Sequence, residues 1–189
     1  MVEKPSIQFC MFTSPIGDLR LFAEQDALIY IQLPESTPLR AELYLRRYYP
    51  GHEITASDSP ILEQTRVELL DYFDHPCRPI SFTVPYRFFG TEFQHQVWSK
   101  IAEIPYGKVI TYAELAQWCK RGKGFARSIG AGCGANPLPI IVPCHRVVGT
   151  NRKLTGFGGG LDVKEWLLCH EGNEVQDRSF LGTFLNEAF

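Results

Sequence analysis

Features of several common protein classes are missing from this sequence. Its 189 residues contain no apolar run of about 18 residues, the length that a membrane-spanning helix needs. The N-terminus lacks a basic segment followed by an apolar one, so we expect no signal peptide, no membrane association, and a cytoplasmic protein of bacterial type. The six cysteines form no CxxC pair and no regular spacing, which indicates a reducing compartment rather than a disulfide framework.

Paired metal-ligand spacings are missing as well. The five histidines and six cysteines include no C-x2-C followed by H-x3-H. The adjacent pairs Cys144-His145 and Cys169-His170 offer poor ligand geometry. We therefore expect no metal site and no cofactor.

Charge is divided unevenly along the chain. The formal net charge is −2, but residues 1–85 carry a balance of −5, residues 86–175 a balance of +4, and residues 176–189 a balance of −1. The positive part is therefore the better candidate for contact with phosphate. A charge of +4 spread over such a length is also compatible with an ordinary solvated surface.

Hydrophobic alternation and turn residues predict that the chain begins with strands. Three short apolar segments separated by tight turns indicate an antiparallel meander. Two helices follow, the second with Ser59 as its N-cap and Pro60 at its first position. The predicted strands span residues 7–12, 19–23 and 28–33, and the predicted helices span residues 39–48 and 60–74.

Two prolines between Cys77 and Phe89 indicate an extended linker. We place a domain boundary near residue 88, which predicts domains at residues 1–88 and 89–175 and a tail at residues 176–189. A last helix, capped by Asp162, is expected before the tail. The tail carries large apolar side chains that either dock on the core or bind a partner, namely Phe180, Leu181, Phe184, Leu185 and Phe189.

The second domain is expected to be mostly helical. Thr91 with Gln94, and Thr111 with Glu114, show the capping-box pattern at the start of two helices. The second of these helices is short, and a glycine-containing turn leads from it to another helix at residues 125–134. Short helix, turn and helix are the order of a helix-turn-helix.

The last helix of this motif carries mostly small residues. Ala126, Ser128 and Gly130 leave little to read base edges in a major groove. Such a surface suits either close approach to a sugar-phosphate wall, as in a minor groove, or close packing against another helix. Arg127 is its one long side chain, and it either contacts DNA or forms a solvated salt bridge.

A cysteine beside a histidine follows this motif, at Cys144 and His145. A neighbouring imidazole can lower the pKa of a thiol, and the thiolate is the nucleophilic form. Adjacent residues on a regular strand point to opposite faces, so contact between the two side chains needs a turn or a bridging water. The alternative is a cysteine that only packs, as we expect for Cys10, Cys77, Cys119, Cys133 and Cys169.

These segments resemble the O6-alkylguanine-DNA alkyltransferase family, also called methylated-DNA–protein-cysteine methyltransferases. The likeness covers about residues 88–173, and its segments are Gly134-Ala135-Asn136-Pro137, Pro143-Cys144-His145-Arg146-Val147, Gly156-Phe157-Gly158-Gly159-Gly160, Val163-Lys164-Glu165-Trp166-Leu167-Leu168 and His170-Glu171-Gly172. It implies an α+β fold, with a ribonuclease-H-like N-terminal domain built on an antiparallel sheet and a mostly helical, winged-helix-like C-terminal domain. The implied partner is double-stranded DNA containing O6-alkylguanine, which we expect a monomer to bind.

The resemblance also implies a reaction. A methyl or alkyl group would pass irreversibly from O6-alkylguanine, and from O4-alkylthymine, to Cys144 in a single turnover. His145 would take the thiol proton through a water, and Glu171 would orient the imidazole. Asn136 would hold the turn that exposes Cys144.

Further roles follow from the same resemblance. Tyr112, assisted by Lys164, would donate a proton towards guanine N3, and Arg127 would fill the gap that a flipped base leaves in the duplex. The implied DNA-contacting residues are Tyr112, Ala126, Arg127, Ser128 and Gly130. The implied substrate-pocket residues are Pro139, Val147, Phe157, Gly158 and Gly159.

Two positions depart from the family pattern. Phe157 stands where tyrosine is common and Gly158 where some members have serine, so both put the substrate range in question. Two other functions stay open at this point. One is a module that binds alkylguanine without repairing it, which the presence of Cys144 disfavours. The other is a cysteine hydrolase that uses Cys144, His145 and Glu171.

Overall fold

The computed structural model describes residues 6–34, 36–182 and 185. The chain divides into two compact units, the first formed by Met1–His75 with Ser81–Phe89 and the second by Pro76–Ile80 with Gly90–Phe189. The stretch predicted to be a single linker is therefore divided between the two units. Both helices and an antiparallel-rich sheet are present, which confirms the α+β class.

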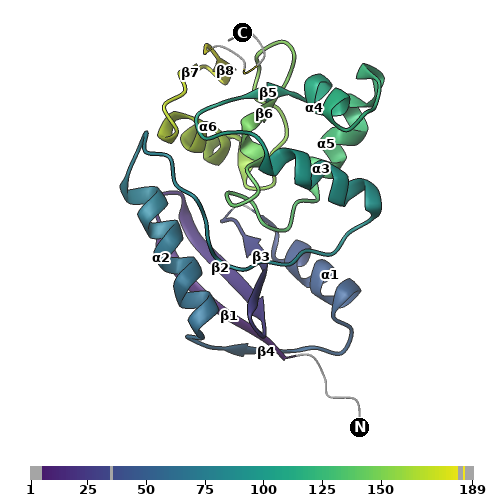
Figure 1. Cartoon of the computed structure of the whole chain (residues 1–189). Helices are drawn as coiled ribbons and strands as arrows, with labels where there is room; N and C mark the ends of the chain where they lie inside the picture. Colours follow the sequence, from purple (N-terminus) through teal and green to yellow (C-terminus); the bar gives the residue numbers. More distant parts are fainter. Residues whose placement is uncertain (1–5, 35, 183–184, 186–189) are drawn as a thin grey trace. The chain divides into compact units, whose positions relative to one another are not determined.

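The first unit is built on a four-stranded sheet (Figure 1). Strands β1 (Ser6–Ser14), β2 (Gly17–Glu24) and β3 (Ala27–Gln32) form the predicted antiparallel meander. A fourth strand, β4 (Glu53–Ala56), pairs in parallel with β1 and completes the order β3-β2-β1-β4. All four residues of β4 are exposed, so it lacks the apolar alternation by which a strand is recognised.

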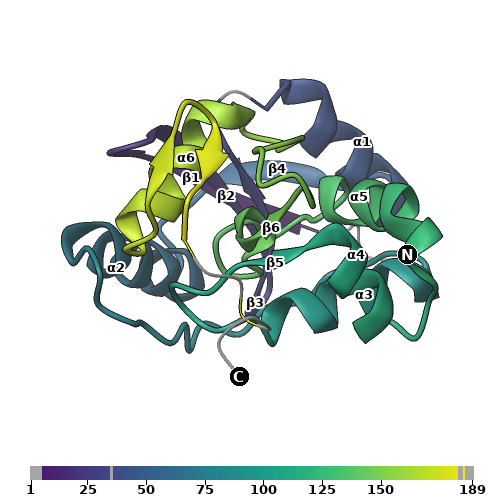
Figure 2. The ribbon, with the colours of Figure 1, turned by 90° about the horizontal axis from the view of Figure 1, so that it is seen from above.

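Two helices cover opposite faces of this sheet, α1 (Pro38–Tyr48) and α2 (Pro60–Asp74) (Figures 1 and 2). Both begin with proline, whose fixed φ and missing N–H suit a first helical turn. Ser59 occupies the N-cap position of α2 as predicted, but its hydroxyl makes no capping hydrogen bond. The predicted N-cap residue and start of the helix are therefore confirmed, although the Ser59 side chain does not satisfy a backbone N–H.

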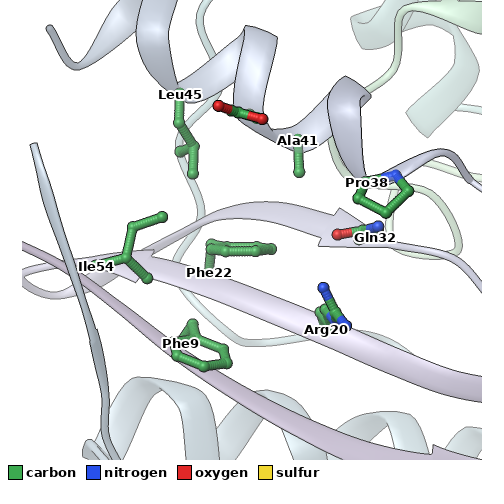
Figure 3. A pocket seen from close by; sticks show the side chains of 9 residues that line it. Phe9, Arg20, Phe22, Gln32, Pro38, Ala41, Leu45 and Ile54 are labelled. Atoms are coloured by element: carbon green, nitrogen blue, oxygen red, sulfur yellow. The ribbon is translucent and has the colours of Figure 1, made fainter.

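A hollow of about 270 Å³ opens between α1 and the sheet. Figure 3 shows Phe9 and Phe22 on the strands below and Leu45 on the helix above. Its lining is mostly apolar, with Arg20 and Gln32 at one end. The residues that the resemblance implicates in catalysis all lie in the other unit.

Three helices of the second unit carry the predicted motif, α3 (Glu92–Ala102), α4 (Tyr112–Trp118) and α5 (Ala126–Gly134). Both predicted capping boxes are present, with reciprocal side-chain and backbone hydrogen bonds at the starts of α3 and α4. A turn of 3-10 helix precedes α5, so α5 begins one residue later than predicted. The longest helix in the described ranges is α2, with 15 residues, and none there is long and apolar enough to cross a membrane.

The small residues of α5 serve two different faces. On one face a side chain at Gly132 would lie 3.3 Å from Val97, and the Gly132 carbonyl accepts a hydrogen bond of 3.0 Å from Trp98 Nε1. On the other face Ser128 is exposed and nothing lies within 4 Å of the position that a side chain at Gly134 would occupy. Close helix packing therefore explains Gly132, whereas the exposed face remains available for a partner.

The remaining elements of the second unit surround the Cys144 segment. Strands β5 (Ile110–Thr111) and β6 (Val147–Val148) pair in parallel, and α6 (Gly160–His170) leads to the hairpin of β7 (Val175–Gln176) and β8 (Ser179–Phe180). The N-cap of α6 is Gly159, so the predicted cap at Asp162 is wrong and that residue lies in the first turn. Phe180 is buried, so this part of the tail docks on the core, whereas Phe184 and Phe189 lie outside the described residues.

Candidate active site

Cys144 begins a turn of 3-10 helix that runs to Arg146. The thiol is only 6% exposed, and Asn136 Nδ2 donates to Cys144 Sγ at 3.2 Å and to the Val142 carbonyl at 2.7 Å. Asn136 Oδ1 accepts the N–H of Leu138 at 3.0 Å. Asn136 thus hydrogen-bonds to both ends of the loop between Leu138 and Cys144. This loop supplies the turn that contact between Cys144 and its neighbours requires.

Ile140, within that loop, has an uncommon backbone conformation. Its φ of 77° lies in the left-handed region, and its side chain is 1% exposed. A β-branched residue is rarely found there, because its side chain crowds the backbone. Strain of this kind persists only where the surroundings impose it, and it is found most often at functional sites.

His145 and Glu171 form a fully buried pair. His145 Nε2 lies 2.8 Å from Glu171 Oε1, and both side chains are 0% exposed. An ionised carboxylate can only accept hydrogen bonds, so Nε2 carries the proton and Nδ1 presents a lone pair. His145 Nδ1 is buried and has no hydrogen-bond partner among the residues that the structure describes. The pair therefore provides an imidazole with an unoccupied basic nitrogen.

Arg146 binds both oxygens of the same carboxylate. Its Nε and Nη2 donate to the two oxygens of Glu171, each at 2.8 Å, and its Nη1 donates to the Ile104 carbonyl at 2.6 Å. The guanidinium also lies 5.6 Å from the centre of the Tyr106 ring. Bidentate pairing of this kind fixes orientation as well as charge. The sequence had indicated no role for Arg146, and its place directly after Cys144-His145 was the only signal.

These contacts set the charge states of the cluster. Burial alone would raise the pKa of Glu171, but the attraction of His145 and Arg146, and the hydrogen bonds from both, lower it well below its usual range. Burial lowers the pKa of His145, outweighing the opposing effect of Glu171. Arg146 already balances the carboxylate charge, so His145 is neutral at neutral pH and can accept a proton.

A second cluster joins Tyr112 and Lys164 through the carbonyl of Thr155. Lys164 is 0% exposed, and its Nζ donates to the Val147 carbonyl at 2.7 Å, the Thr155 carbonyl at 3.0 Å and Tyr112 Oη at 3.4 Å. Tyr112 Oη donates to the same Thr155 carbonyl at 3.1 Å. All three N–H groups of the buried ammonium are therefore satisfied. Sequence reasoning missed Thr155, because a backbone acceptor leaves no residue-type signature.

The pKa values in this cluster are shifted by burial and by Cys144. Burial lowers the pKa of Lys164 to about 8, and the negative charge of a Cys144 thiolate opposes that change. Burial raises the pKa of Tyr112, and the Cys133 and Cys144 thiolates raise it further. The Cys144 thiol is therefore within electrostatic range of both groups, so the two clusters belong to one site.

The residues expected to contact DNA lie on α5. Arg127 and Ser128 are exposed, and Arg127 makes no hydrogen bond or ion pair with any residue in the described part of the chain. The alternative of a solvated salt bridge therefore has no partner there. A side chain at Gly130 would come within 3.9 Å of the Tyr112 ring, and Ala126 is half-buried.

The residues expected to form a substrate pocket are buried or half-buried. Phe157 and Gly158 are half-buried, and Gly159 is buried at the start of α6. Pro139 is buried, and the side chain of Val147 is 0% exposed. Only the carbonyl of Val147 reaches the Lys164 cluster, so its contribution there is through the backbone.

Comparison with known proteins gives a consistent result. Residues 92–173 match the model of the 6-O-methylguanine DNA methyltransferase DNA-binding domain. The methylated-DNA–protein-cysteine methyltransferase of Methanosarcina acetivorans is 35% identical over 165 residues, which cover 87% of this chain and 98% of that protein. The protein of the same name from Salmonella typhimurium is 38% identical over 84% of this chain and 92% of its own length. The crystal structure of Mycobacterium tuberculosis O6-methylguanine methyltransferase has a TM-score of 0.73 at 34% identity, covering 87% of this chain and 92% of that one.

Proposed function

Because the chain belongs to the methylated-DNA–protein-cysteine methyltransferase family, we propose that Cys144 is the residue to which it transfers the alkyl group of O6-alkylguanine in DNA. The protein is a DNA repair enzyme that uses its own cysteine as the acceptor. The product is a thioether and no thiol is regenerated, so each molecule acts once. The observation that carries this assignment is the buried pair that Glu171 forms with His145, the residue directly after Cys144, because this pair supplies a base of defined tautomer.

The first step is removal of the Cys144 proton. His145 Nδ1 accepts it through one water, and Glu171 stabilises the imidazolium that results. Arg146 keeps the carboxylate in place by donating to both of its oxygens, and Oε1 accepts from Arg146 Nη2 and from His145 Nε2 together. Asn136 donates a hydrogen bond to the sulfur and so favours the thiolate over the thiol.

The second step is displacement at the alkyl carbon. A bond forms between Cys144 Sγ and that carbon, the bond from the carbon to O6 breaks, and its electron pair passes to the guanine. Tyr112 donates its proton to N3 of the departing base, and the Lys164 ammonium stabilises the phenolate. The single O–H of Tyr112 donates to the Thr155 carbonyl in this structure, so the hydroxyl turns towards N3 in this step, while Lys164 remains bonded to the same carbonyl.

Access to the base requires the nucleotide to leave the duplex, because O6 lies inside the base stack. The exposed face of α5 offers small residues against the DNA backbone, and Arg127 can occupy the vacated space. O6-alkylguanine in double-stranded DNA is therefore the proposed substrate. The candidate residues all belong to one chain, so a monomer suffices.

Mass spectrometry after incubation with a duplex containing O6-methylguanine tests the proposal. One added methyl group on the peptide that contains Cys144, with equimolar loss from the DNA, is the expected result. Tight binding without modification would instead indicate a binding module. Continued turnover beyond one substrate per protein would indicate a hydrolase.

A further inference from the structure

The chain after residue 173 lies outside the matched family domain, and its described residues 174–182 contain a two-stranded hairpin. Its strands, β7 and β8, are joined through Asp177 and Arg178, whose φ values are 48° and 60°. Two consecutive left-handed residues define a type I′ turn, in which asparagine and glycine are favoured. Arginine at the second position of this turn is conformationally unfavourable, and such a conformation persists only where the surrounding structure imposes it.

The hairpin pairs with the loop that precedes Thr155. The N–H of Leu154 donates to the Arg178 carbonyl and the N–H of Phe180 donates to the Arg152 carbonyl, both at 2.7 Å. Arg152 Nη1 also donates to the Gly182 carbonyl at 2.6 Å. Phe180, 1% exposed, packs in an apolar cluster that includes Leu154. The tail is thus an added strand along this loop, anchored by a buried ring.

The Arg178 side chain reaches a different element, helix α6. Its Nη2 pairs with Asp162, and its Nε lies 3.4 Å from Glu165 Oε2. These two acids flank Lys164 in the sequence of the helix. Arg178 therefore binds the loop through its backbone and the Lys164 segment of α6 through its side chain.

The same loop and helix must meet for the Tyr112–Lys164 cluster to form. Thr155 directly follows Leu154, and its carbonyl accepts from both Lys164 Nζ and Tyr112 Oη. We propose that Arg178 is a positioning residue for alkyl transfer, which holds the Thr155 carbonyl against α6 so that Lys164 and Tyr112 act together. This inference rests on the proposed roles of Tyr112 and Lys164 in the reaction.

Two substitutions test the role of the Arg178 side chain without disturbing the conformation of the turn. Arg178→Gly and Arg178→Asn both suit a left-handed conformation, so the hairpin is retained while the link to α6 is removed. Gln25→Gly is the matched control, because Gln25 also has a positive φ, of 54°, but lies in the β2–β3 turn of the first unit. Arg178→Lys retains a cation for Asp162 and Glu165 and should recover part of the activity.

The first measurement is the single-turnover rate of methyl transfer at saturating duplex, and of reaction with free O6-benzylguanine. We expect Arg178→Gly and Arg178→Asn to slow both about 10-fold, below the ~10²-fold that a misplacement of 1 Å can cost. The second is an NMR titration of the Lys164 ε-carbon in 13C-lysine protein. With the loop released, the pKa of Lys164 should rise from about 8 towards the ordinary value of lysine.

The outcomes distinguish this inference from the proposed function. A wild-type protein that transfers no methyl group overturns the function itself. A wild-type protein that transfers, with Arg178→Gly and Arg178→Asn equal to it in rate and in the Lys164 titration, overturns the positioning role. Slower transfer with an unchanged Lys164 titration also overturns it, because the loss then arises elsewhere. Slower transfer with a raised Lys164 pKa, partly recovered in Arg178→Lys, supports it.

Discussion

The two units of the chain bury very different groups. Among the described residues of the first unit, the buried polar side chains are Ser14, Gln32 and Thr65, and none is charged. Among its described residues the second unit buries the basic and acidic side chains of His145, Arg146, Lys164, His170 and Glu171, together with the Cys144 thiol. The interior of the first unit is thus an ordinary apolar core. This unit nevertheless contains α2, the longest described helix, and the only four-stranded sheet of the described chain.

Buried charge is costly, so its concentration in one unit is informative. Removing an ion from water costs several kcal/mol, and pairing only partly offsets that cost. The cluster of His145, Arg146 and Glu171 meets the cost with a bidentate pair and a third hydrogen bond. Fold stability alone does not require such groups, because apolar residues would fill the same space. We therefore expect substitutions of the buried charged groups in the second unit to change the rate of alkyl transfer, and measurements of rate and of unfolding free energy test this separately.

The largest effect is expected from removal of the Cys144 sulfur. Cys144→Ala and Cys144→Ser should both abolish transfer, because the only bond-forming atom is lost or becomes a much weaker nucleophile at neutral pH. Binding to duplex should remain, since it is spread over many phosphate contacts. The measurement is methyl groups transferred per protein. Cys169→Ser, at an exposed cysteine, is the control and should transfer normally. Stoichiometric transfer by either Cys144 variant contradicts the assignment.

Glu171→Gln should affect both rate and stability. The rate should fall by no more than the ~10²–10⁴-fold typical of positioned acid-base groups, because the imidazolium loses its counter-charge. Unfolding free energy should fall by about 3–5 kcal/mol, because Arg146 is left as an unpaired buried charge. Single-turnover kinetics and urea unfolding measure the two effects. Glu103→Gln, which removes an exposed partner of Lys100, should change neither by much. An unchanged rate in Glu171→Gln removes Glu171 from the mechanism.

Arg127→Ala should impair repair of duplex DNA and spare the free base. Unstacking a nucleotide costs a few kcal/mol, and a side chain in the gap offsets part of it, so we expect a loss of about 10-fold on duplex. Reaction with free O6-benzylguanine should be nearly unchanged. Arg121→Ala, at another exposed arginine near α5, provides the comparison at saturating DNA. Equal slowing on both substrates, or none on duplex, argues against a role in base flipping.

The smallest expected effect is on the pH dependence of stability. The pKa of Lys164 is about 8 in the folded protein and near the ordinary lysine value when unfolded, so the unfolded chain binds more protons between these values. Wild-type stability should therefore gain about 1–2 kcal/mol from this group between pH 8 and pH 10, and lose it again as pH falls. Urea unfolding of Lys164→Met should lack that gain, whereas the exposed Lys108→Met should keep it. Parallel curves for Lys164→Met and wild type would contradict the shift.

Much of the fold was predictable because its signals are local. Both capping boxes depend on residues three apart, and both helix starts agree with the prediction. The first three strands have tight turns and apolar alternation. Strands β4, β5 and β6 pair with distant segments, and β5 and β6 are only two residues long. Neither their length nor their hydrophobic pattern therefore predicted them. Asp162 was assigned to a cap, but its carboxylate pairs with an arginine 16 residues away.

The residue types of the candidate site were predictable from the sequence, but the hydrogen bonds that connect them were not. The family likeness selects Cys144, His145 and Glu171, and the structure places the last two in contact. The tautomer of His145 follows from that contact and from no feature of the sequence. Arg146 joins a carboxylate 25 residues away, and Thr155 acts through a carbonyl that every residue possesses. Contacts of these two kinds require coordinates.

Trp98 gives the protein an internal optical reporter. Its indole is 1% exposed, and its N–H is bonded to the Gly132 carbonyl of α5, the helix whose opposite face is proposed to meet DNA. Indole emission depends on the polarity and hydrogen bonding around the ring, so a shift of α5 against α3 changes the colour of the emitted light. Retaining Trp98 while replacing Trp118 and Trp166 with phenylalanine would let engagement of DNA be followed in real time without an added dye.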